Sequence, residues 1–566
     1  MKTICANLWC KAAFEVSEDD LAFYDRISPV IAGKKHAIPP PLICADCRQQ
    51  RRLAFRNERH LYKQTCNLCK SSIISIYSSD KGYTVYCPRC WWSDAWDALS
   101  YGRPFDFQRP FFPQFQELFR VVPKMAVLTI GLNMNSDYVH DVYMSKNCYL
   151  LFDGEQCQDS YYGEVFARIR NCCDFFYLKD SELCYDCVHC LHGYSLVGCR
   201  FCSNCSESFF LLDCRGCRHC IGCVNLVEKE YHIFNKPHTK EEYERFLSSS
   251  GVHTWTGYKS LQEQASKFSL LHPRRAVRGT MNEHVRGDNL SNCKDVFDCF
   301  DCDDMRDCRH CTNCPMGATD CFDLDAWGDR LNTAYDCAYA GADSRGLAGC
   351  WYVGNSASDI LHSAYCLQGG ANMLGCVGMR KKEFCILNTQ YSKEEYETLA
   401  LRIVEHMKKT AEWCQFFPTN LSAFAYNETV AQQYYPVTEK QALERGWRWK
   451  HDIDETPKAG KVIPAAKLPD SIDDIPDDIL NWAITCEKTG KPFRIIKQEL
   501  DFYKQLHLPV PRLHQDERHH QRITWRNPRK LWNRRCMKCS KGMQTSYAPD
   551  RPEKIYCEDC YLKEVY

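Results

Sequence analysis

One spacing of cysteines constrains this chain more than any other feature. The pattern Cys-x2-Cys, seventeen residues, Cys-x2-Cys occurs near each end, at Cys66, Cys69, Cys87 and Cys90 and again at Cys536, Cys539, Cys557 and Cys560. A Cys-x2-Cys turn directs two sulfur atoms to one ion, and two such turns complete a tetrahedron around zinc. The spacing therefore predicts two zinc sites. Because four thiolates leave no open position for water, we expect their role to be structural.

The two sites belong to a duplicated module. Cys66 and Cys536 are 470 positions apart, and the same offset relates surrounding residues such as Pro39 and Pro509, Arg52 and Arg522, and Tyr86 and Tyr556. A module of about ninety residues is thus present at both ends of the chain. Inside each site, residues 72–86 and 542–556 are rich in β-branched and aromatic residues, which predicts the hairpin of a zinc ribbon.

The N-terminal copy carries a second set of four cysteines, Cys5, Cys10, Cys44 and Cys47. Cys44-x2-Cys47 has ordinary zinc-ligand spacing and Cys5-x4-Cys10 is looser; together they predict a third site, and about three zinc ions per chain. In the C-terminal copy, His514 and Glu517 replace Cys44 and Cys47, and only Cys486 remains upstream. Cys486 and His514 supply only half a site, so we base no metal prediction on them.

The composition bears on redox state and compartment. The chain has 566 residues, of which 40 are cysteine. Its first residues lack the apolar core of a signal peptide, and no apolar run is long enough to span a membrane, so we expect a cytoplasmic protein with reduced thiols. A disulfide-rich protein exported by an unusual route is the alternative. The 72 basic and 72 acidic residues balance, so net charge indicates no partner.

Each terminal module also carries a basic stripe. Arginines recur at helical spacing with aromatic residues among them, at Arg48, Arg52, Arg56 and Arg59 and again at Arg518, Arg522, Arg526 and Arg529. Such stripes can contact successive phosphates while the rings stack on bases, which makes RNA or a ribonucleoprotein a candidate partner. Two alternatives remain open. In the first, the arginines pair with carboxylates, either in acidic stretches of the same chain such as residues 295–307 or 470–478, or in a protein partner. In the second, they form a solvated face.

The middle of the chain is periodic. Cysteines recur every fifteen residues, at Cys157, Cys172, Cys187, Cys202 and Cys217. Fifteen residues suit three short sides of a coil, so we expect a β-solenoid in which equivalent side chains stack; a helix is the weaker alternative. The cysteines fit a narrow core as small buried thiols. Bound metal and redox chemistry are the other interpretations.

The middle is itself duplicated at an offset of 153, as Lys240-Glu241-Glu242-Tyr243 and Lys393-Glu394-Glu395-Tyr396 show. Each copy ends in a predicted helix with a capping box, Thr239 with Glu242 and Ser392 with Glu395. The predicted fold is mostly β with some α, with zinc-ribbon modules flanking a duplicated cysteine-rich β-solenoid. The expected domains are a double zinc module (1–100), a first repeat with its helix (133–247), a connector (248–285), a second repeat (286–410), an irregular segment and linker (411–480) and a C-terminal zinc ribbon (481–566).

Several motifs resemble a known family. They are ICADCRQQRRLAFRNERHLY, YCPRCWWSDAWD, GCVNLVEKEYHIFNK, FFPTNLSAFAYNETVAQQYYP and RPEKIYCEDCYLKEVY, and they are spread over nearly the whole chain. The chain is similar to the uncharacterised cysteine-rich zinc-ribbon protein family of small-genome uncultured bacteria. This resemblance implies zinc binding.

The functional expectation is a non-enzymatic zinc-binding scaffold or adaptor whose target is RNA, a ribonucleoprotein or a protein complex, with no membrane partner. The sequence contains no phosphate-binding glycine loop, no nucleophile elbow and no His-Glu-x2-His motif. We therefore predict no catalytic residues. A metal-handling or redox-sensing protein that uses the cysteines of the middle is the alternative.

Overall fold

The computed structural model describes residues 1–185, 187, 194–198, 203–314, 317–323, 325, 333–338, 341, 344–346, 348–349, 351, 353–451 and 459–565. The chain is mixed α/β and divides into two compact units. Unit 1 contains Met1–Val127 and Val277–Ile453, and unit 2 contains Leu128–Ala276 and Asp454–Tyr566. Each terminal module thus shares a unit with the cysteine-rich repeat that is farther from it in sequence.

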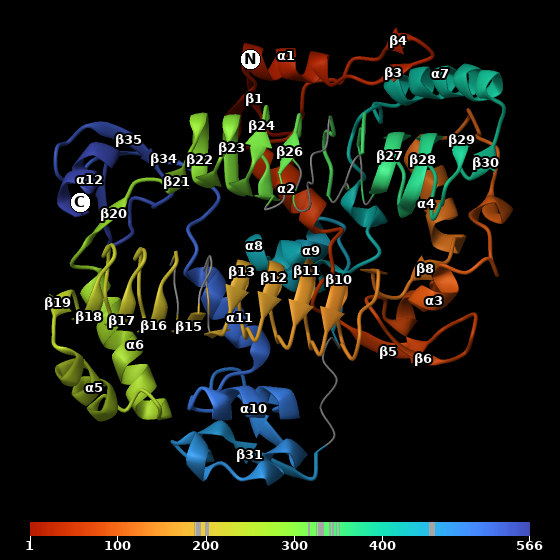
Figure 1. Cartoon of the computed structure of the whole chain (residues 1–566). Helices are drawn as coiled ribbons and strands as arrows, with labels where there is room; N and C mark the ends of the chain where they lie inside the picture. Colours follow the sequence, from red (N-terminus) through yellow and green to blue (C-terminus); the bar gives the residue numbers. More distant parts are fainter. Residues whose placement is uncertain are drawn as a thin grey trace. The chain divides into compact units, whose positions relative to one another are not determined.

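The first repeat, in unit 2, consists of short parallel strands. β10 (His140–Lys146), β11 (Phe152–Gln158), β12 (Glu164–Arg170) and β13 (Phe176–Glu182) lie side by side in one row (Figure 1). β9 (Thr129–Ile130) completes this sheet. A second sheet contains β14 (Cys184–Tyr185), β15 (Tyr194–Val197), β16 (Ser206–Phe209), β17 (Arg218–Ile221), β18 (Glu230–Ile233) and β19 (Lys236–Pro237).

The pairing register corrects the predicted period. Phe152 pairs with Glu164, and Glu164 with Phe176, so successive strands are offset by twelve residues and not by fifteen. From Asp141 to Asp174 every third residue has a positive φ, a conformation that Asp and Asn tolerate best. The local unit is therefore three residues long, and twelve and fifteen are both multiples of it. The three-sided, fifteen-residue β-solenoid expected from the cysteine spacing is not found.

The second repeat, in unit 1, has a less regular register. β22 (Glu283–Ser291) and β23 (Lys294–Asp303) pair in parallel with an irregularity between Arg286 and Gly287. Their sheet also contains β21 (Gly279–Thr280), β24 (Met305–Arg306), β25 (Thr312–Cys314) and β26 (Ala318–Thr319). A further sheet contains β27 (Val353–Leu361), β28 (Cys366–Leu374), β29 (Glu383–Ile386) and β30 (Thr389–Gln390).

The two predicted capped helices are confirmed. α5 (Lys240–Ser249) has the capping box of Thr239 and Glu242, and α7 (Lys393–Lys409) has that of Ser392 and Glu395. α5 contacts β18 and α7 contacts β29, so each helix packs on the last parallel strand of its repeat. α6 (Trp255–Ser269) follows α5 in the chain.

The terminal modules have matching elements. In unit 1, β5 (Tyr62–Thr65) and β6 (Ser72–Ser75) form an antiparallel pair, and β7 (Val85–Tyr86) pairs in parallel with β8 (Lys124–Met125). In unit 2, β34 (Trp532–Arg535) pairs with β35 (Gly542–Thr545), and β36 (Lys554–Tyr556) pairs with β20 (Pro273–Arg275). The hairpin therefore includes the strand before the first Cys-x2-Cys turn, instead of lying wholly inside residues 72–86 and 542–556.

Shorter elements complete both units. Unit 1 contains β1 (Lys2–Ile4), β2 (Ala13–Glu15), α1 (Glu18–Arg26), β3 (Val30–Ile31), β4 (Lys34–Lys35), α2 (Ala45–Leu53), α3 (Pro88–Trp91), α4 (Phe111–Val121), α8 (Val430–Tyr434) and α9 (Glu439–Glu444). Unit 2 contains β31 (Lys461–Pro464), β32 (Trp482–Thr485), β33 (Pro492–Phe493), α10 (Lys497–Gln505), α11 (Gln515–Thr524) and α12 (Glu558–Val565). Among the described residues, no helix is both long and apolar enough to cross a lipid bilayer.

Candidate metal centres

The structure assembles all three predicted cysteine quartets. In each one the four sulfur atoms lie within 4.8 Å of one another, and the groups are Cys5, Cys10, Cys44 and Cys47; Cys66, Cys69, Cys87 and Cys90; and Cys536, Cys539, Cys557 and Cys560. A tetrahedral ion with Zn–S bonds of about 2.3 Å requires sulfur atoms about 3.8 Å apart. Each quartet could therefore hold a metal ion.

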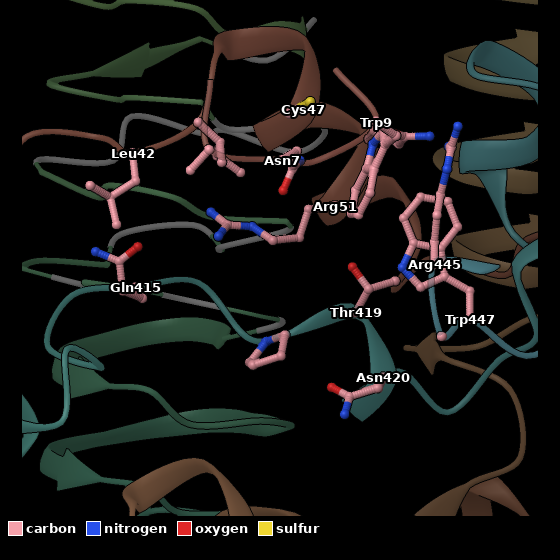
Figure 2. A pocket seen from close by; sticks show the side chains of 15 residues that line it. Asn7, Trp9, Leu42, Cys47, Arg51, Gln415, Thr419, Asn420, Arg445 and Trp447 are labelled. Carbon is pink, nitrogen blue, oxygen red and sulfur yellow. The ribbon is translucent and has the colours of Figure 1, made fainter. Parts of the chain in front are cut away.

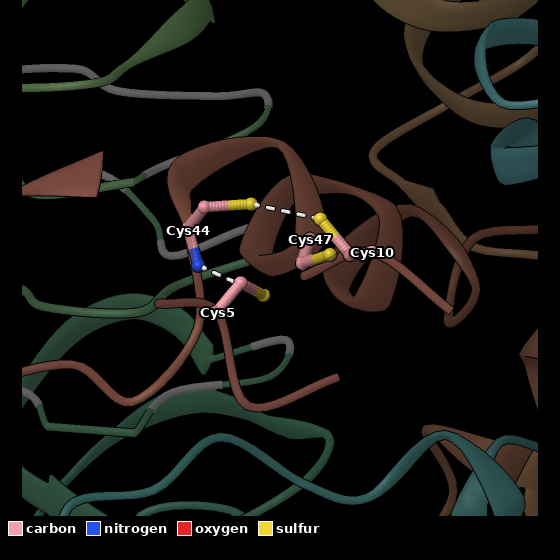
Figure 3. Close-up of side chains that lie close together, drawn as sticks. All are labelled: Cys5, Cys10, Cys44 and Cys47. Carbon is pink, nitrogen blue, oxygen red and sulfur yellow. Dashed lines mark hydrogen bonds between the residues drawn. The ribbon is translucent and has the colours of Figure 1, made fainter. Parts of the chain in front are cut away.

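The first quartet, which we call site A, joins a loop to a helix start. Cys5 follows β1, Cys44 immediately precedes α2, and Cys47 lies in its first turn. The Cys10 and Cys44 sulfur atoms are 3.7 Å apart, and the backbone N–H of Cys44 donates to the Cys5 sulfur at 3.4 Å (Figure 3). Three of the four cysteines are buried, and Cys10 is half-buried. An ion at site A would tie the first turn of α2 to the N-terminal loop.

The second quartet, site B, has the same construction in the N-terminal ribbon. Cys66 follows β5, and Cys87 caps α3, which contains Cys90. The sulfur atoms of Cys69 and Cys87 are 3.9 Å apart. Lys70, directly after Cys69, has φ +62°, which closes the turn that brings the first two sulfur atoms together.

The third quartet, site C, repeats site B at the other end of the chain. Cys536 follows β34, Cys557 directly precedes α12, and Cys560 lies in that helix. The sulfur atoms of Cys539 and Cys557 are 3.6 Å apart. The backbone N–H of Cys557 donates to the Cys536 sulfur at 3.3 Å, as the N–H of Cys87 does to Cys66 at the same distance.

In each quartet the surroundings lower the pKa of at least one cysteine and raise that of another, such as Cys47, Cys90 or Cys560. The Cys47 thiol hydrogen-bonds Cys44 and lowers the pKa of Cys44 to about 5. The Ser71 hydroxyl lowers the pKa of Cys69 to about 6. At Cys536, burial opposes ionisation, but the N–H of Cys557 and neighbouring backbone donors lower the pKa to about 6. Zinc binds the thiolate form, so a lowered pKa reduces the cost of releasing protons on binding.

The C-terminal counterpart of site A forms no comparable group. Within the described part of the chain, only the three quartets bring three or more ligand atoms so close together. Here the ammonium of Lys488 forms an ion pair with Glu517, the residue that corresponds to Cys47. An ion pair within the chain thus lies where site A has its cysteine sulfurs.

The cysteines of the central repeats that the structure describes are buried, and Cys302 and Cys376 are two examples. Burial raises the pKa of Cys302 and of Cys376 well above the ordinary value of a thiol. Their thiols donate to backbone carbonyls, as Cys302 does to Phe300 at 3.2 Å. For these two cysteines the geometry fits the interpretation of small, neutral core residues. Cys202 of the predicted ladder lies outside the described residues.

The arginine stripe of unit 1 is buried. Arg52 is 0% exposed and contacts three aspartates: Nε to Asp325 at 2.6 Å, Nη1 to Asp336 at 2.6 Å and Nη1 to Asp323 at 3.3 Å. Arg48 also pairs with Asp323. Arg56 donates to the backbone carbonyl of Asp325 and pairs with Glu58, and the half-buried Arg59 also has an interaction partner.

Unit 2 repeats this arrangement. Arg518 donates to Asp174 at 2.6 Å and lies 3.4 Å from Glu499, and Arg522, 0% exposed, lies 3.3 Å from Asp174. Arg526 is buried and Arg529 half-buried, and both have interaction partners. Six of the stripe arginines are therefore enclosed by protein: Arg48, Arg52, Arg56, Arg518, Arg522 and Arg526. This burial agrees with the alternative in which the arginines pair within the chain. At most 8% of any of these residues is exposed, so they present almost no surface to the phosphates of a nucleic acid in this conformation.

The partners of the stripes differ from those expected. Arg48 and Arg52 pair with Asp323, Asp325 and Asp336 of the second repeat, and not with residues 295–307. Asp323 and Asp325 lie two residues apart in the sequence, and this close spacing is a signal that the expected acidic stretches did not include. Asp174 carries no comparable signal, because isolated aspartates are frequent throughout the first repeat.

Comparison with known proteins adds no relative. No family model, no curated protein and no solved structure matches this chain.

Proposed function

We propose that the protein is a non-enzymatic scaffold that binds three structural zinc ions, one at each of sites A, B and C. The observation that carries this proposal is the convergence of four cysteine sulfurs in each quartet, all within 4.8 Å of one another. Zinc is the metal that tetrahedral four-sulfur sites most often hold, with iron as the main competitor. The family that the sequence resembles implies the same metal.

The ligand set supports a structural role. Four protein sulfurs fill the coordination shell of zinc, so no position is left for a water or a substrate. The ligands come from segments far apart in the chain, such as Cys5 and Cys44. Because the unfolded chain has no preformed site, the free energy of binding contributes directly to folding.

Site A connects metal binding to the buried arginines. Cys44 and Cys47 lie at the start of α2, and Arg48 and Arg52 follow on the same helix. An ion that fixes this first turn also fixes the direction in which both guanidiniums enter the second repeat. In unit 2 the ion pair of Lys488 and Glu517 lies at the start of α11 and supports Arg518 in the same way.

Elemental mass spectrometry of the purified full-length protein tests the proposal. We expect three zinc ions per chain, and two after Cys90→Ser, Cys560→Ser or Cys47→Ser, since each substitution removes one ligand from one quartet. The matched control is Cys376→Ser, a buried cysteine outside the quartets, which should retain three. Iron in place of zinc, or the same loss of zinc in Cys376→Ser as in Cys90→Ser, would contradict the proposal.

A further inference from the structure

Unit 1 contains a pocket of about 420 Å³ next to site A. One wall comes from the loop between Cys5 and Cys10 and from α2, and the other from the segment between Gln415 and Trp447. Figure 2 shows Trp9, Arg445 and Trp447 together at one side, Leu42 and Gln415 at the other, and Arg51 between them. We call this cavity the Trp9 pocket. Its volume is in the range that binds small molecules.

The charge of the pocket is positive. Its fifteen lining residues include two arginines, Arg51 and Arg445, and no aspartate or glutamate. Arg51 forms an ion pair with Asp336, a residue that does not line the pocket. The buried Nε of Arg51 has no hydrogen-bond partner among the described residues. Arg445 forms no ion pair within the described part of the chain; its guanidinium lies 5.1 Å from the ring centres of both Trp9 and Trp447. The pocket therefore suits an anion.

The indole rings of Trp9 and Trp447 indicate a second property of the ligand, a flat ring. Trp9 packs edge-on against Trp447 with ring centres 5.3 Å apart, yet 41% of Trp9 is exposed. Exposed indole next to a guanidinium is a surface on which a flat, uncharged ring can stack. The remaining walls supply amides that can hydrogen-bond the edge of such a ring, among them Asn7, Gln415 and Asn420. Inorganic phosphate would use the arginines and leave the ring surface bare.

From these features we infer that the Trp9 pocket binds a nucleotide, with its base stacked on Trp9 and its phosphate at Arg445 and Arg51. The nucleotide is either free or one residue of a single-stranded RNA, since both present a base beside a phosphate. This inference goes beyond the scaffold function and uses residues other than the buried stripes. Cys47 lines the pocket, and Asn7 and Trp9 lie between the site A ligands Cys5 and Cys10, so an ion at site A would order one wall.

Isothermal titration of the full-length, zinc-loaded protein tests the inference with AMP, UMP, a uridine octanucleotide and inorganic phosphate as probes. We expect AMP or UMP to bind at least about ten-fold more tightly than phosphate, because stacking adds to the ionic contact. Affinity should fall as salt rises. If the octanucleotide binds about as tightly as UMP, the ligand is a free nucleotide. If the octanucleotide binds more than about ten-fold more tightly than UMP, the ligand is a strand of RNA.

Trp9→Leu and Arg445→Gln should each weaken AMP binding by about ten-fold or more, whereas Arg402→Gln should not. Arg402 is the matched control because its guanidinium also lies over a ring, that of Phe107 at 4.5 Å, but outside the pocket. All three variants should retain the zinc content of the parent protein, so failure here leaves the scaffold proposal standing. Equal affinity for phosphate and AMP, absence of binding by all nucleotide probes, or unchanged AMP binding in Trp9→Leu would overturn the inference.

Discussion

Replacement of Arg52 by methionine tests the buried ion network most directly. Methionine approximates the volume of the arginine stem but removes the charge that three aspartates face. Arg48 still pairs with Asp323 and Arg51 with Asp336, so Asp325 is the carboxylate that loses its cation. Among the described residues, Asp325 keeps only the Gln49 amide, at 2.8 Å, and the Thr312 hydroxyl as side-chain donors.

The expected loss of folding stability in Arg52→Met follows from this geometry. Removal of one partner of a buried ion pair typically costs about 3–5 kcal/mol, because the remaining charge stays buried without compensation. The surviving pairs place Arg52→Met near the lower end of that range, still a large part of the roughly 5–15 kcal/mol that stabilises an ordinary domain. The substitution Asp325→Asn removes the orphaned charge. The double variant should therefore be less destabilised than the sum of the two single variants.

The effect should also depend on pH. In the parent protein, burial acts to raise the pKa of Asp323, but Arg48 and Arg52 outweigh it and lower the pKa. This contribution to stability is present above the ordinary pKa of an aspartate and is lost as pH falls through the lowered value. In Arg52→Met, Asp323 loses one of the two arginines that lower its pKa and gains a proton more readily, so the deficit in stability relative to the parent should be smaller near pH 5 than near pH 8.

Hydrogen exchange measured by mass spectrometry in increasing urea reports each unit separately. The peptides to follow are those that cover α2, with peptides of unit 2 as the internal reference. Arg109→Met is the matched control, because Arg109 forms an exposed ion pair with Glu117. If Arg52→Met changes the protection of α2 no more than Arg109→Met does, the ion network does not hold the helix in place.

Two further substitutions test other buried polar groups of unit 1. His362 is 0% exposed, neither ring nitrogen has a hydrogen-bond partner among the described residues, and burial lowers its pKa to about 3. Below the ordinary histidine pKa of about 6.5, unfolding therefore takes up a proton at His362. The free energy of unfolding of unit 1 should fall by about 1.4 kcal/mol per pH unit between pH 6.5 and about 3. In urea titrations, His362→Leu should abolish this part of the pH dependence. The Glu412 carboxylate accepts the backbone N–H groups of Phe111 and Phe112, each at 2.8 Å, at the start of α4. Glu412→Gln should cost about 1–2 kcal/mol because one donor loses its acceptor, and an unchanged urea midpoint would show that α4 does not depend on this cap.

The cysteine quartets were accessible from sequence because local geometry defines half of each one. A Cys-x2-Cys turn fixes two sulfurs through the backbone alone, as the positive φ of Lys70 and Ser540 directly after Cys69 and Cys539 shows. Duplication of the module then indicated which two turns belong together. The same comparison identified the position where His514 and Glu517 had replaced the ligands. Helix caps were predictable for the same reason, since Thr239 and Glu242 interact within one turn.

The period of the repeats was not accessible from cysteine spacing. With a three-residue unit, cysteines in equivalent environments can recur at any multiple of three. Cys157 and Cys172 are fifteen residues apart, but the residue that pairs with Cys157 in the next strand is Ile169. Backbone hydrogen bonds between strands set this register, and they do not depend on which side chain recurs.

The sequence by itself determined the four-sulfur sites, the duplications and the helical spacing of the arginines, because each depends on residues close together in the chain or on comparison of one copy with the other. Only the tertiary structure decided that these arginines face inward, since Arg48 meets Asp323 across 275 positions of sequence. It also decided that the N-terminal module packs with the second repeat, and that residues near Trp9 and near Arg445 enclose one pocket. A guanidinium stripe has the same sequence whether it binds phosphate or buried carboxylates, and the difference lies in which distant chain segment covers it.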